Sequence, residues 1–432
     1  MSETWTSWSQ EHTCRPAVLA RPTSVAEVQR LVREAAAAGR VVRVAGAGHS
    51  FTPCVVTDGT LLSLERMSRV LDVDREAGLV RVEAGITLNA CSEALAAHGL
   101  AFENLGDIDV QSIAGATATG THGTGARLRN LSSALHAIEL VRGDGEVVEL
   151  DEASDPDGWR AARVSLGALG VVTAVTVRVV PAFTLRGVDT PMPLAEVLPR
   201  LDELADGSEH FEFFTFPHSP LALTRTNTRT TEPPRPRSRA AAFVQDELLV
   251  NRAFGVANRV ARARPSWIPA INRLVSRASG TSVRVDRSDR IFASPRSVRF
   301  TEMEYAIPRE HGRTALERVR ALVQDGGHAV SFPFEVRFVA GDDAFLSPAG
   351  GRDTCYIASH VFEGMPWEPF LRGVEGIMRE LDGRPHWGKR HFRTAEDLRP
   401  VYPDFDRFLA VRDRLDPGRV FTNPYVAQVL GP

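Results

Sequence analysis

Near the N-terminus, hydrophobic residues recur at helical spacing. They fall on one face of the predicted helix: Val25, Val28, Leu31, Val32 and Ala35. Ser24 is a suitable N-cap, Glu27 stands where a capping-box partner is expected, and Gly39 can end the helix in a left-handed conformation. The sequence therefore predicts a helix that begins at Ser24 and ends at Gly39.

After Gly39 the hydrophobic period changes from helical to alternating. Val41–Ala45 alternates and is rich in β-branched residues, which predicts a strand. Gly46-Ala47-Gly48 follows and can bring the backbone close to a flat or anionic ligand, because it offers almost no side-chain bulk. A dinucleotide-binding fingerprint would need a third glycine and a helix at position 51, where Phe51 stands and Thr52-Pro53 follows. We therefore expect a strand, a small-residue loop and a histidine, His49, beside the bound group.

The same two periods divide most of the remaining chain into strands and helices. Strands are predicted over 70–73, 79–82, 138–141, 147–150, 171–180, 211–216 and 332–338. Helices are predicted over 88–98, 308–324 and 369–381. The run 224–239 is dense in Thr, Arg and Pro, and we expect an exposed loop there.

A second small-residue stretch lies in the segment 103–125. From Ala114 to Gly125 it consists almost entirely of Gly, Ala and Thr, and His122 is its one large residue. A flexible linker is the alternative, but linkers are rarely rich in Ala and Thr with an embedded histidine. We favour a segment that wraps backbone amides and hydroxyls around a pyrophosphate.

Three charged residues in the second half are candidates for chemistry. Glu335 and Arg337 are two positions apart on a predicted strand and so share a face. A solvated ion pair is the simpler explanation, but the flanking phenylalanines make the strand nearly apolar, which favours a shared pocket. Lys389 follows Trp387 and could add positive charge there; on its own it would be taken for a surface lysine.

Composition limits the function classes. The chain has 432 residues, 43% hydrophobic and 24% charged, with a net charge of −3, which gives no reason to expect binding to nucleic acid or to an anionic membrane. The first residues do not resemble a signal peptide, and no apolar run is long enough to span a membrane. The four cysteines are widely separated, which argues against a zinc site or disulfides. We expect a cytoplasmic protein without a metal.

Five motifs in order carry a resemblance to a known family. They are Ala45-Gly46-Ala47-Gly48-His49-Ser50-Phe51, Ala118-Thr119-Gly120-Thr121-His122-Gly123-Thr124-Gly125, Glu335-Val336-Arg337, His386-Trp387-Gly388-Lys389 and Phe421-Thr422-Asn423. Together they resemble the flavin-linked aldonolactone and alditol oxidoreductases of the vanillyl-alcohol-oxidase superfamily. The resemblance implies an α+β fold with an FAD-binding domain (1–183), an antiparallel-sheet cap domain for substrate (184–393) and a C-terminal segment (394–432) that returns to the FAD domain.

The resemblance also implies roles for individual residues. FAD would be the cofactor, bonded covalently to its 8α-methyl group through His49. The residues expected to bind FAD are Ala45, Gly46, Ala47, Gly48, His49, Ser50, Gly106, Asp107, Ser112, Gly115, Thr119, Thr121, His122, Gly123, Val171 and Lys389. The residues expected in catalysis are Glu335, Arg337, Lys389 and His360, with His360 as a possible base and a packed histidine as the alternative.

Substrate and acceptor follow from single positions within the resemblance. Asp107 and His360 differ from the serine and threonine of alditol oxidases, which favours a sugar lactone over a polyol. Gly106 stands where an alanine in this family is associated with poor access of O2, so it favours an oxidase, although another electron acceptor stays open. The competing hypotheses are an alditol oxidase, a flavoprotein-fold binding protein without turnover, and an NAD-dependent dehydrogenase.

Overall fold

The structure is a computed structural model that describes residues 3–236, 252–294 and 298–432. Its N-terminal part begins with a small parallel sheet in the order β3-β5-β4, next to helix α1. The elements up to this sheet are β1 (Trp5–Thr6), β2 (Thr13–Cys14), β3 (Val18–Ala20), α1 (Val25–Ala37), β4 (Val42–Ala45) and β5 (Thr60–Ser63). The loop that follows β4 is the small-residue loop predicted from the sequence.

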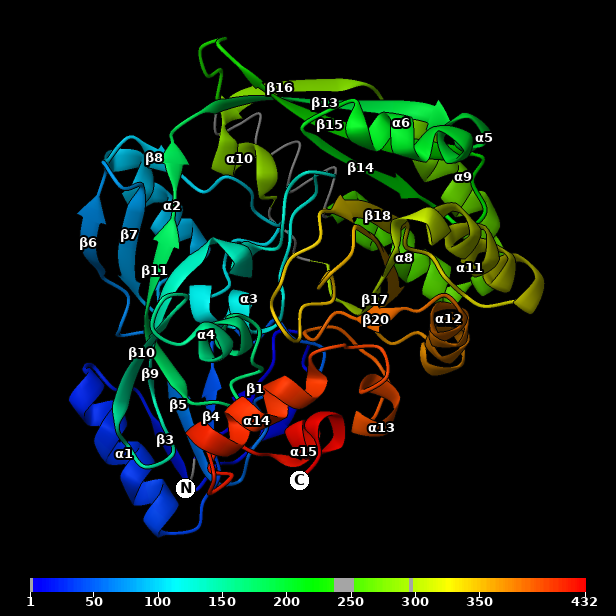
Figure 1. The fold of residues 1–432 in the computed structure, drawn as a ribbon. Helices are drawn as coiled ribbons and strands as arrows, with labels where there is room; N and C mark the ends of the chain where they lie inside the picture. The colour runs from blue at the N-terminus through cyan, green and yellow to red at the C-terminus, as the bar shows by residue number, and fades with distance from the viewer. Residues whose placement is uncertain (1–2, 237–251, 295–297) are drawn as a thin grey trace.

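A five-stranded antiparallel sheet, in the order β10-β9-β11-β7-β6, completes the N-terminal part. Its elements and those around it are β6 (Val70–Asp74), β7 (Leu79–Glu83), α2 (Leu88–Ala97), β8 (Leu100–Ala101), α3 (Ile113–Ala118), β9 (Leu135–Val141), β10 (Val147–Asp151), α4 (Pro156–Arg163), β11 (Val171–Arg178) and β12 (Val180–Pro181). Figure 1 shows this part beside the strands of the second half, with α14 and α15 below.

The second half is built on one large sheet, in the order β16-β13-β15-β14-β18-β19-β17-β20. The strands are β13 (Thr184–Pro193), β14 (His210–Thr215), β15 (Leu221–Thr230), β16 (Ser282–Arg287), β17 (Phe300–Pro308), β18 (Phe334–Val339), β19 (Thr354–Phe362) and β20 (Arg384–Pro385). Each printed pairing between neighbours is antiparallel. Register brings Arg337 of β18 opposite Glu212 of β14 and Tyr356 of β19.

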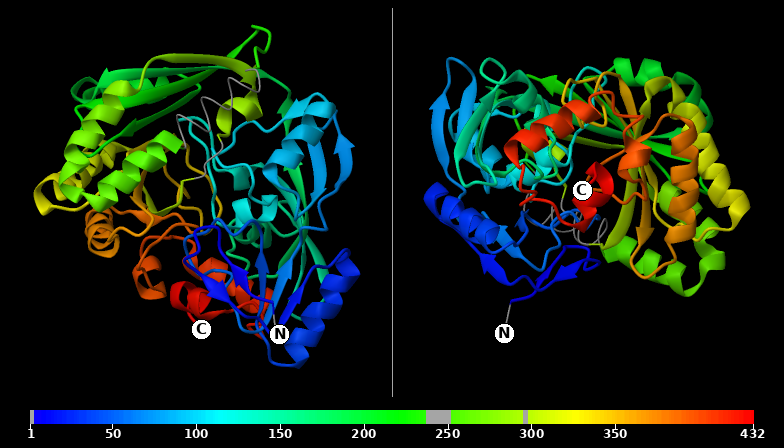
Figure 2. Two further views of the ribbon diagram at one scale, coloured as in Figure 1. Left: turned by 180° about the vertical axis from the view of Figure 1, so that it is seen from behind. Right: turned by 60° about the horizontal axis from the view of Figure 1, so that its bottom comes forward.

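Helices cover one face of this sheet, and the opposite face looks toward the N-terminal part (Figures 1 and 2). The helices of the second half are α5 (Leu194–Val197), α6 (Leu201–Asp206), α8 (Phe254–Ala263), α9 (Ile268–Ala278), α10 (Ser288–Phe292), α11 (Gly312–Gly326) and α12 (Glu368–Glu380). Leu316 and Val319 of α11 and Leu371 and Val374 of α12 belong to the buried cluster of this covered face. The uncovered face is therefore available for a site.

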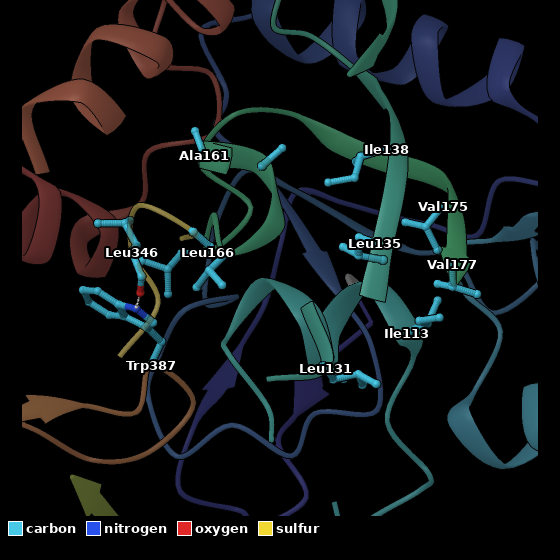
Figure 3. Packing of buried hydrophobic residues seen from close by; sticks show 14 of the residues in the cluster. Ile113, Leu131, Leu135, Ile138, Ala161, Leu166, Val175, Val177, Leu346 and Trp387 are labelled. Atoms are coloured by element: carbon cyan, nitrogen blue, oxygen red, sulfur yellow. Dashed lines mark hydrogen bonds between the residues drawn. The ribbon is translucent and has the colours of Figure 1, made fainter. Parts of the chain in front are cut away.

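The C-terminal helices pack on the N-terminal part. They are α13 (Ala395–Leu398), α14 (Phe405–Leu415) and α15 (Pro424–Leu430), and their buried residues join the cluster that contains Ile113 and Leu135. Trp387 lies in the same cluster, where its Nε1 donates to Leu346 O at 2.6 Å (Figure 3). The boundaries at 183 and 393 stay a prediction.

The predicted N-cap of helix α1 is confirmed, but the capping-box residue makes a different hydrogen bond from the one predicted. Ser24 Oγ accepts from Glu27 N, as predicted, but the Glu27 carboxylate accepts from Thr23 N at 2.6 Å and does not return to Ser24. Gly39 has φ +63°, as a helix-ending glycine requires.

Two expectations need correction. The segment 224–239 is not wholly a loop, because Thr224 to Thr230 continue strand β15; residues 237–239 lie outside the described part. Arg225 pairs there with Asp189 of β13 and Arg229 pairs with Glu209, which directly precedes β14, and these ion pairs stabilise a polar strand. The segment 103–125 contains a helix, α3, which its glycine- and threonine-rich sequence did not suggest.

Two general expectations concern thiols and membranes. All four cysteines are free thiols. Within the described ranges, no helix has the length and hydrophobicity needed to cross a bilayer.

Candidate functional site

The larger of two connected cavities lies where the β4 loop meets helix α3. Its volume is about 330 Å³. Nine of the predicted binding residues line it: Ala45, Gly46, Ala47, Gly48, His49, Ser50, Ser112, Gly115 and Thr119. The two small-residue stretches, more than 60 positions apart by number, therefore form opposite walls of one cavity.

The walls of this cavity are close enough to require glycine. A Cβ on Gly46 would overlap Ser112 Oγ, and Gly48 has φ +70°, a left-handed conformation that favours glycine. Ser112 caps α3, and its hydroxyl accepts from Gly115 N at 3.3 Å. Backbone amides and hydroxyls thus stand at the surface of a space that side chains leave open, which fits a diphosphate group.

A buried arginine, Arg43, forms part of the same wall. Its guanidinium donates to four backbone carbonyls, including Leu166 O at 2.6 Å and Phe421 O at 2.6 Å. Burial lowers the pKa of Arg43 to about 10, so the group stays charged at neutral pH. It connects the C-terminal segment to the cavity and brings positive charge to it.

His49 lies at the junction of the two cavities. It lines both of them, and its ring stacks on Trp8 with centroids 5.0 Å apart. Burial, together with the positive charge of Lys389, lowers the pKa of His49 to about 4. At neutral pH the ring is therefore uncharged and keeps a nitrogen lone pair.

The smaller cavity, of about 80 Å³, continues from the larger one and has a different lining. His49, Ser50, Gln111 and Thr119 line both, so the two cavities meet at these residues. The predicted residues that line only the smaller cavity are Gly106, Asp107, Thr121, His122, Arg337 and Lys389. Charged side chains take the place of the small residues here.

Arg337 is held in the smaller cavity by three carboxylates. It contacts Glu335 on its own strand, Glu212 on β14 at 2.8 Å and Asp107 at 3.5 Å. Burial alone would lower the pKa of Arg337, but these carboxylates outweigh it and raise the pKa well above the ordinary value. Glu335 and Arg337 share a buried face, as predicted.

Lys389 reaches the same cavity from the loop before α13. Its Nζ contacts the Glu302 carboxylate and lies 5.4 Å from the centre of the Phe51 ring. The loop is fixed by backbone hydrogen bonds: Phe51 N donates to Gly388 O, and Arg390 N donates to Glu302 O. Burial opposes the charge of Lys389, yet Glu302 outweighs it and raises the pKa of the ammonium group.

His360 contacts Glu302 from the far side. Its Nε2 lies 3.5 Å from Glu302 Oε1, and its Nδ1 lies 3.2 Å from Pro333 O. A carbonyl can only accept, so Nδ1 carries a proton and Nε2 is left facing a carboxylate. Despite burial, Lys389 and His360 lower the pKa of Glu302 well below its ordinary value.

A second buried cluster joins His122, Glu304 and His386. His122 stacks on Tyr356 with centroids 3.7 Å apart, and its Nε2 lies 3.3 Å from Glu304 Oε1. The possible ligand atoms of the three residues lie within 4.8 Å of one another, a spacing that a metal ion could bridge. The donor set argues against a metal, because Gly388 N donates to His386 Nδ1 at 3.0 Å and so leaves the proton of the neutral ring on Nε2.

Some predicted residues lie next to the cavities without lining them. Glu335 and His360 are absent from the described residues that line either space, and they contact Arg337 and Glu302 instead. Val171 is buried in a core, while its neighbours Gly170 and Val172 line the larger cavity. A Cβ on Gly123 would overlap Leu105 O, so this glycine allows two backbone segments to meet.

Several lining residues were not predicted. They are Trp5, Trp8, Arg43, Gln111, Phe300, Glu302, Glu304 and His386. Glu302 and Glu304 had a usable signal, because they alternate along an otherwise apolar strand in the same way as Glu335 and Arg337. Trp5 and Trp8 belong to the N-terminal segment, whose local sequence gives no sign of a cavity wall.

The arrangement combines two capabilities. The larger cavity can hold a diphosphate-containing group by backbone amides. The smaller one offers two cations, the buried Arg337 and the partly buried Lys389, which can stabilise negative charge, and the carboxylates of Asp107 and Glu302, which can orient hydroxyl groups.

Two family descriptions match the chain. Residues 16–151 match an FAD binding domain, and residues 175–429 match D-arabinono-1,4-lactone oxidase. The first match contains the β4 loop and α3, and the second contains Arg337 and Lys389.

Similar proteins cover the whole chain. The L-gulono-1,4-lactone dehydrogenase of Mycobacterium tuberculosis is 51% identical over 432 residues, which is 100% of both chains. The L-gulonolactone oxidase of Bos taurus is 35% identical over 98% of this chain and 97% of its own. A crystal structure of cholesterol oxidase from B. sterolicum matches with a TM-score of 0.86 at 19% identity, over 100% of this chain and 97% of the other, which is a likeness of fold.

Proposed function

Because the chain belongs to the family of FAD-dependent aldonolactone oxidoreductases, we propose that its two connected cavities hold FAD and substrate respectively. The protein is an FAD-dependent oxidoreductase that acts on a CH–OH group of L-gulono-1,4-lactone or a related aldonolactone. The observation that supports the assignment of the cavities is that a glycine-walled space and a space with two cations meet at shared lining residues.

The residues that form the walls of the larger cavity are suited to binding FAD. A side chain on Gly46 would fill the space against Ser112, and Arg43 adds positive charge where the diphosphate would lie. When bound, FAD supplies the acceptor for the hydride that leaves the carbinol carbon. We propose that Gly46, Ser112 and the adjoining amides hold its diphosphate.

Arg337 and Lys389 are proposed to stabilise negative charge in the smaller cavity. Arg337 is buried and Lys389 is partly buried, and neighbouring carboxylates raise the pKa of both groups, so both stay ionised. Charges fixed in a water-excluded space lower the free energy of a transition state without reorganisation during the reaction. Glu335 then serves to position Arg337, which it contacts.

Glu302 is proposed to accept the hydrogen bond of the reacting hydroxyl. Its carboxylate lines the smaller cavity, and Lys389 and His360 keep it ionised. His360 contacts Glu302 through Nε2 and so can take part in moving the released proton away, rather than as the first acceptor.

A lactone fits these residues better than a polyol. Asp107 lines the cavity in contact with Arg337, and a carboxylate there narrows the space that a longer open-chain alditol would need. The relatives described above are named for lactones. Alditol oxidation is therefore the weaker candidate, and we propose O2 as one electron acceptor because position 106, which lines the smaller cavity, carries no side chain. A cytoplasmic location stays a prediction.

We propose that His49 forms a covalent bond to FAD. Its ring is neutral at physiological pH and stands at the junction of the two cavities. Acid precipitation of the purified protein, followed by visible spectra of pellet and supernatant, tests this directly. We expect flavin absorbance in the pellet of the wild-type protein and in the supernatant of His49→Ala.

Controls separate the bond from the activity. Anaerobic addition of L-gulono-1,4-lactone should bleach the flavin, while xylitol should do so far more slowly. Flavin in the wild-type supernatant would refute the bond and leave FAD binding intact. A colourless protein that does not take up added FAD, or a flavin that the lactone does not bleach, would refute the proposed function.

A further inference from the structure

Helices α8 and α9 carry their large apolar side chains on the outside. Of the eight large hydrophobic residues that are exposed in the described part of the chain, five lie between Val256 and Val283. Trp267 is 57% exposed and Leu274 is 69% exposed, although both are on or next to α9. On a helix that only covers a domain, such side chains would face the core.

The inner faces of the two helices combine a few large apolar residues with polar and small ones; Phe254, Ile268 and Ile271 pack on the buried cluster of the domain. The buried residues are Gly255, Asn258 and Ala261 on α8 and Ile268, Asn272 and Ser276 on α9. Hydrogen bonds attach these faces to the domain: Ser331 Oγ donates to Asn258 Oδ1 at 2.6 Å, and Asn272 Nδ2 donates to Ser331 O at 3.1 Å. Five of the six fully buried residues are polar or small, and large apolar residues therefore stand on the outer faces as well as the inner faces of the two helices.

The same segment is strongly basic. Its exposed arginines are Arg252, Arg259, Arg262, Arg264, Arg273 and Arg277. The sequence contains neither Asp nor Glu from Leu248 to Val285. The net charge of the whole chain, −3, conceals this local excess, and a partner for this surface must be anionic.

Exposed arginines stand next to the exposed apolar residues in the sequence of both helices. On α9, Arg273 and Arg277 adjoin Leu274, and on α8, Arg259 and Arg262 adjoin Val260. Both helices lie at the outer edge of the second half (Figure 2). A protein partner that buried the apolar residues would also have to desolvate these charges, which is costly. Lipid headgroups can pair with the arginines while Trp and Leu enter the layer beneath them.

We propose that the exposed face of α8 and α9 binds the surface of an anionic lipid bilayer. The bilayer is not crossed; the apolar side chains enter the headgroup region and the arginines pair with lipid phosphates. This inference does not depend on the identity of the substrate or on the assignment of the two cavities.

Co-sedimentation of the full chain with lipid vesicles tests the proposal. One set is phosphatidylcholine alone, and the other contains equal parts of phosphatidylcholine and phosphatidylglycerol. We expect binding to the second set only, weakened by high salt. The R273Q/R277Q variant should bind about thirtyfold more weakly, because each of the two basic residues near an anionic surface contributes about fivefold to the affinity.

Matched variants separate surface insertion from general charge or folding. R66Q/R75Q removes two exposed arginines elsewhere and should leave binding unchanged. We expect anionic vesicles to cause a blue shift of tryptophan emission in the wild type, and W267F should remove that shift. Because W267F keeps an aromatic residue, it serves as the test if the more disruptive variant W267S/L274S does not fold. Thermal melting and flavin absorbance show whether each variant is intact.

Three results would overturn the proposal. They are absence of binding to both vesicle sets, equal binding to both, and binding that R273Q/R277Q and R66Q/R75Q weaken to the same extent. Sedimentation velocity of the lipid-free chain gives a fourth: a dimer that W267F or W267S/L274S dissociates would show that a second copy covers this face.

Discussion

The two connected cavities differ in what their walls are made of and in how the chain assembles them. The larger is lined mainly by glycine, alanine and hydroxyl residues, and more than half of these come from two segments, 43–55 and 110–119. The smaller is lined by Asp107, Glu302, Glu304, Arg337 and Lys389, which come from separate strands and loops. We expect the space between the walls to control binding in the larger cavity, and the balance of charges to control the reaction rate in the smaller one.

This difference teaches where substitutions should act. In the larger cavity the close approach of backbones leaves no room for a Cβ, so small changes in volume should alter binding. In the smaller cavity each cation is balanced by carboxylates, so a change of charge should alter reaction rate and stability together.

The largest expected effect comes from removing a cation of the smaller cavity. Arg337→Met should raise the activation free energy of flavin reduction by roughly 3 kcal/mol or more, which lowers the rate about a hundredfold, while FAD still binds. Stopped-flow absorbance under anaerobic conditions measures this step.

Arg225→Met is the matched control for that change. Arg225 pairs with Glu212, as Arg337 does, and with Asp189, but it is not among the described residues that line the smaller cavity. Both variants should lose stability, and only Arg337→Met should lose reduction rate. Equal reduction rates in the two variants would remove Arg337 from catalysis.

The next largest effect should be on FAD binding, from a change in the larger cavity that leaves the smaller, charged cavity intact. Gly46→Ala places a Cβ against Ser112 Oγ and should weaken FAD binding roughly tenfold to a hundredfold. Titration of the flavin-free protein with FAD measures the dissociation constant. If His49 bonds FAD covalently, the titration is made in the His49→Ala background.

Ser112→Ala provides the control for this clash. It removes the overlapping oxygen, so the double variant should recover part of the affinity, although α3 loses its cap. If Ser112→Ala lowers the affinity for FAD equally with and without Gly46→Ala, the two walls do not interact. The larger cavity would then be wrongly assigned as the site of the FAD diphosphate.

Much of this contrast could be predicted from sequence, but unevenly. The β4 loop and the stretch around Ser112 are local, so their composition alone indicated a binding segment. Helix α3 was missed because glycine and threonine lower helix propensity, and its cap and burial against the core stabilise it instead.

The smaller cavity depends on register, which single-sequence patterns do not provide. Glu212 reaches Arg337 only because β14 pairs with β18, and Glu302 reaches Lys389 only because the 386–390 loop runs beside β17. Strand β15 was taken for a loop for a related reason: its arginines are stabilised by cross-strand carboxylates that are distant in sequence.

A smaller effect should appear in stability as a function of pH. Burial, reinforced by Arg393, lowers the pKa of His391 to about 3, so the folded state does not take up the proton that the unfolded state binds below its ordinary pKa. Stability should therefore fall with decreasing pH, by about 1.4 kcal/mol per pH unit for this residue.

Urea unfolding at several values between about pH 4 and pH 6 measures that slope. His391→Phe should reduce the slope and leave FAD affinity unchanged, because His391 lies outside the described lining of both cavities. His98→Phe, at an exposed helix end, is the control and should leave the slope as it is. An identical slope in wild type and His391→Phe would show that this histidine does not remain neutral in the folded state.

The smallest change tests whether shape also matters in the charged cavity. Gly106 lines it, and an added Cβ would lie 3.0 Å from His122 O and 3.6 Å from Thr121 Cγ2. Gly106→Ala should therefore cost about 1 kcal/mol in stability, because one backbone segment must shift slightly.

The methyl group would also occupy space through which O2 could approach, so reoxidation by O2 should slow roughly tenfold while reduction by lactone is spared. Stopped-flow mixing of the reduced protein with O2 measures the first rate, and an artificial acceptor such as dichlorophenolindophenol serves as the control. If both acceptors slow equally, the effect comes from altered packing around His122 and not from access, and the contrast between a shape-limited and a charge-determined cavity would hold without exception.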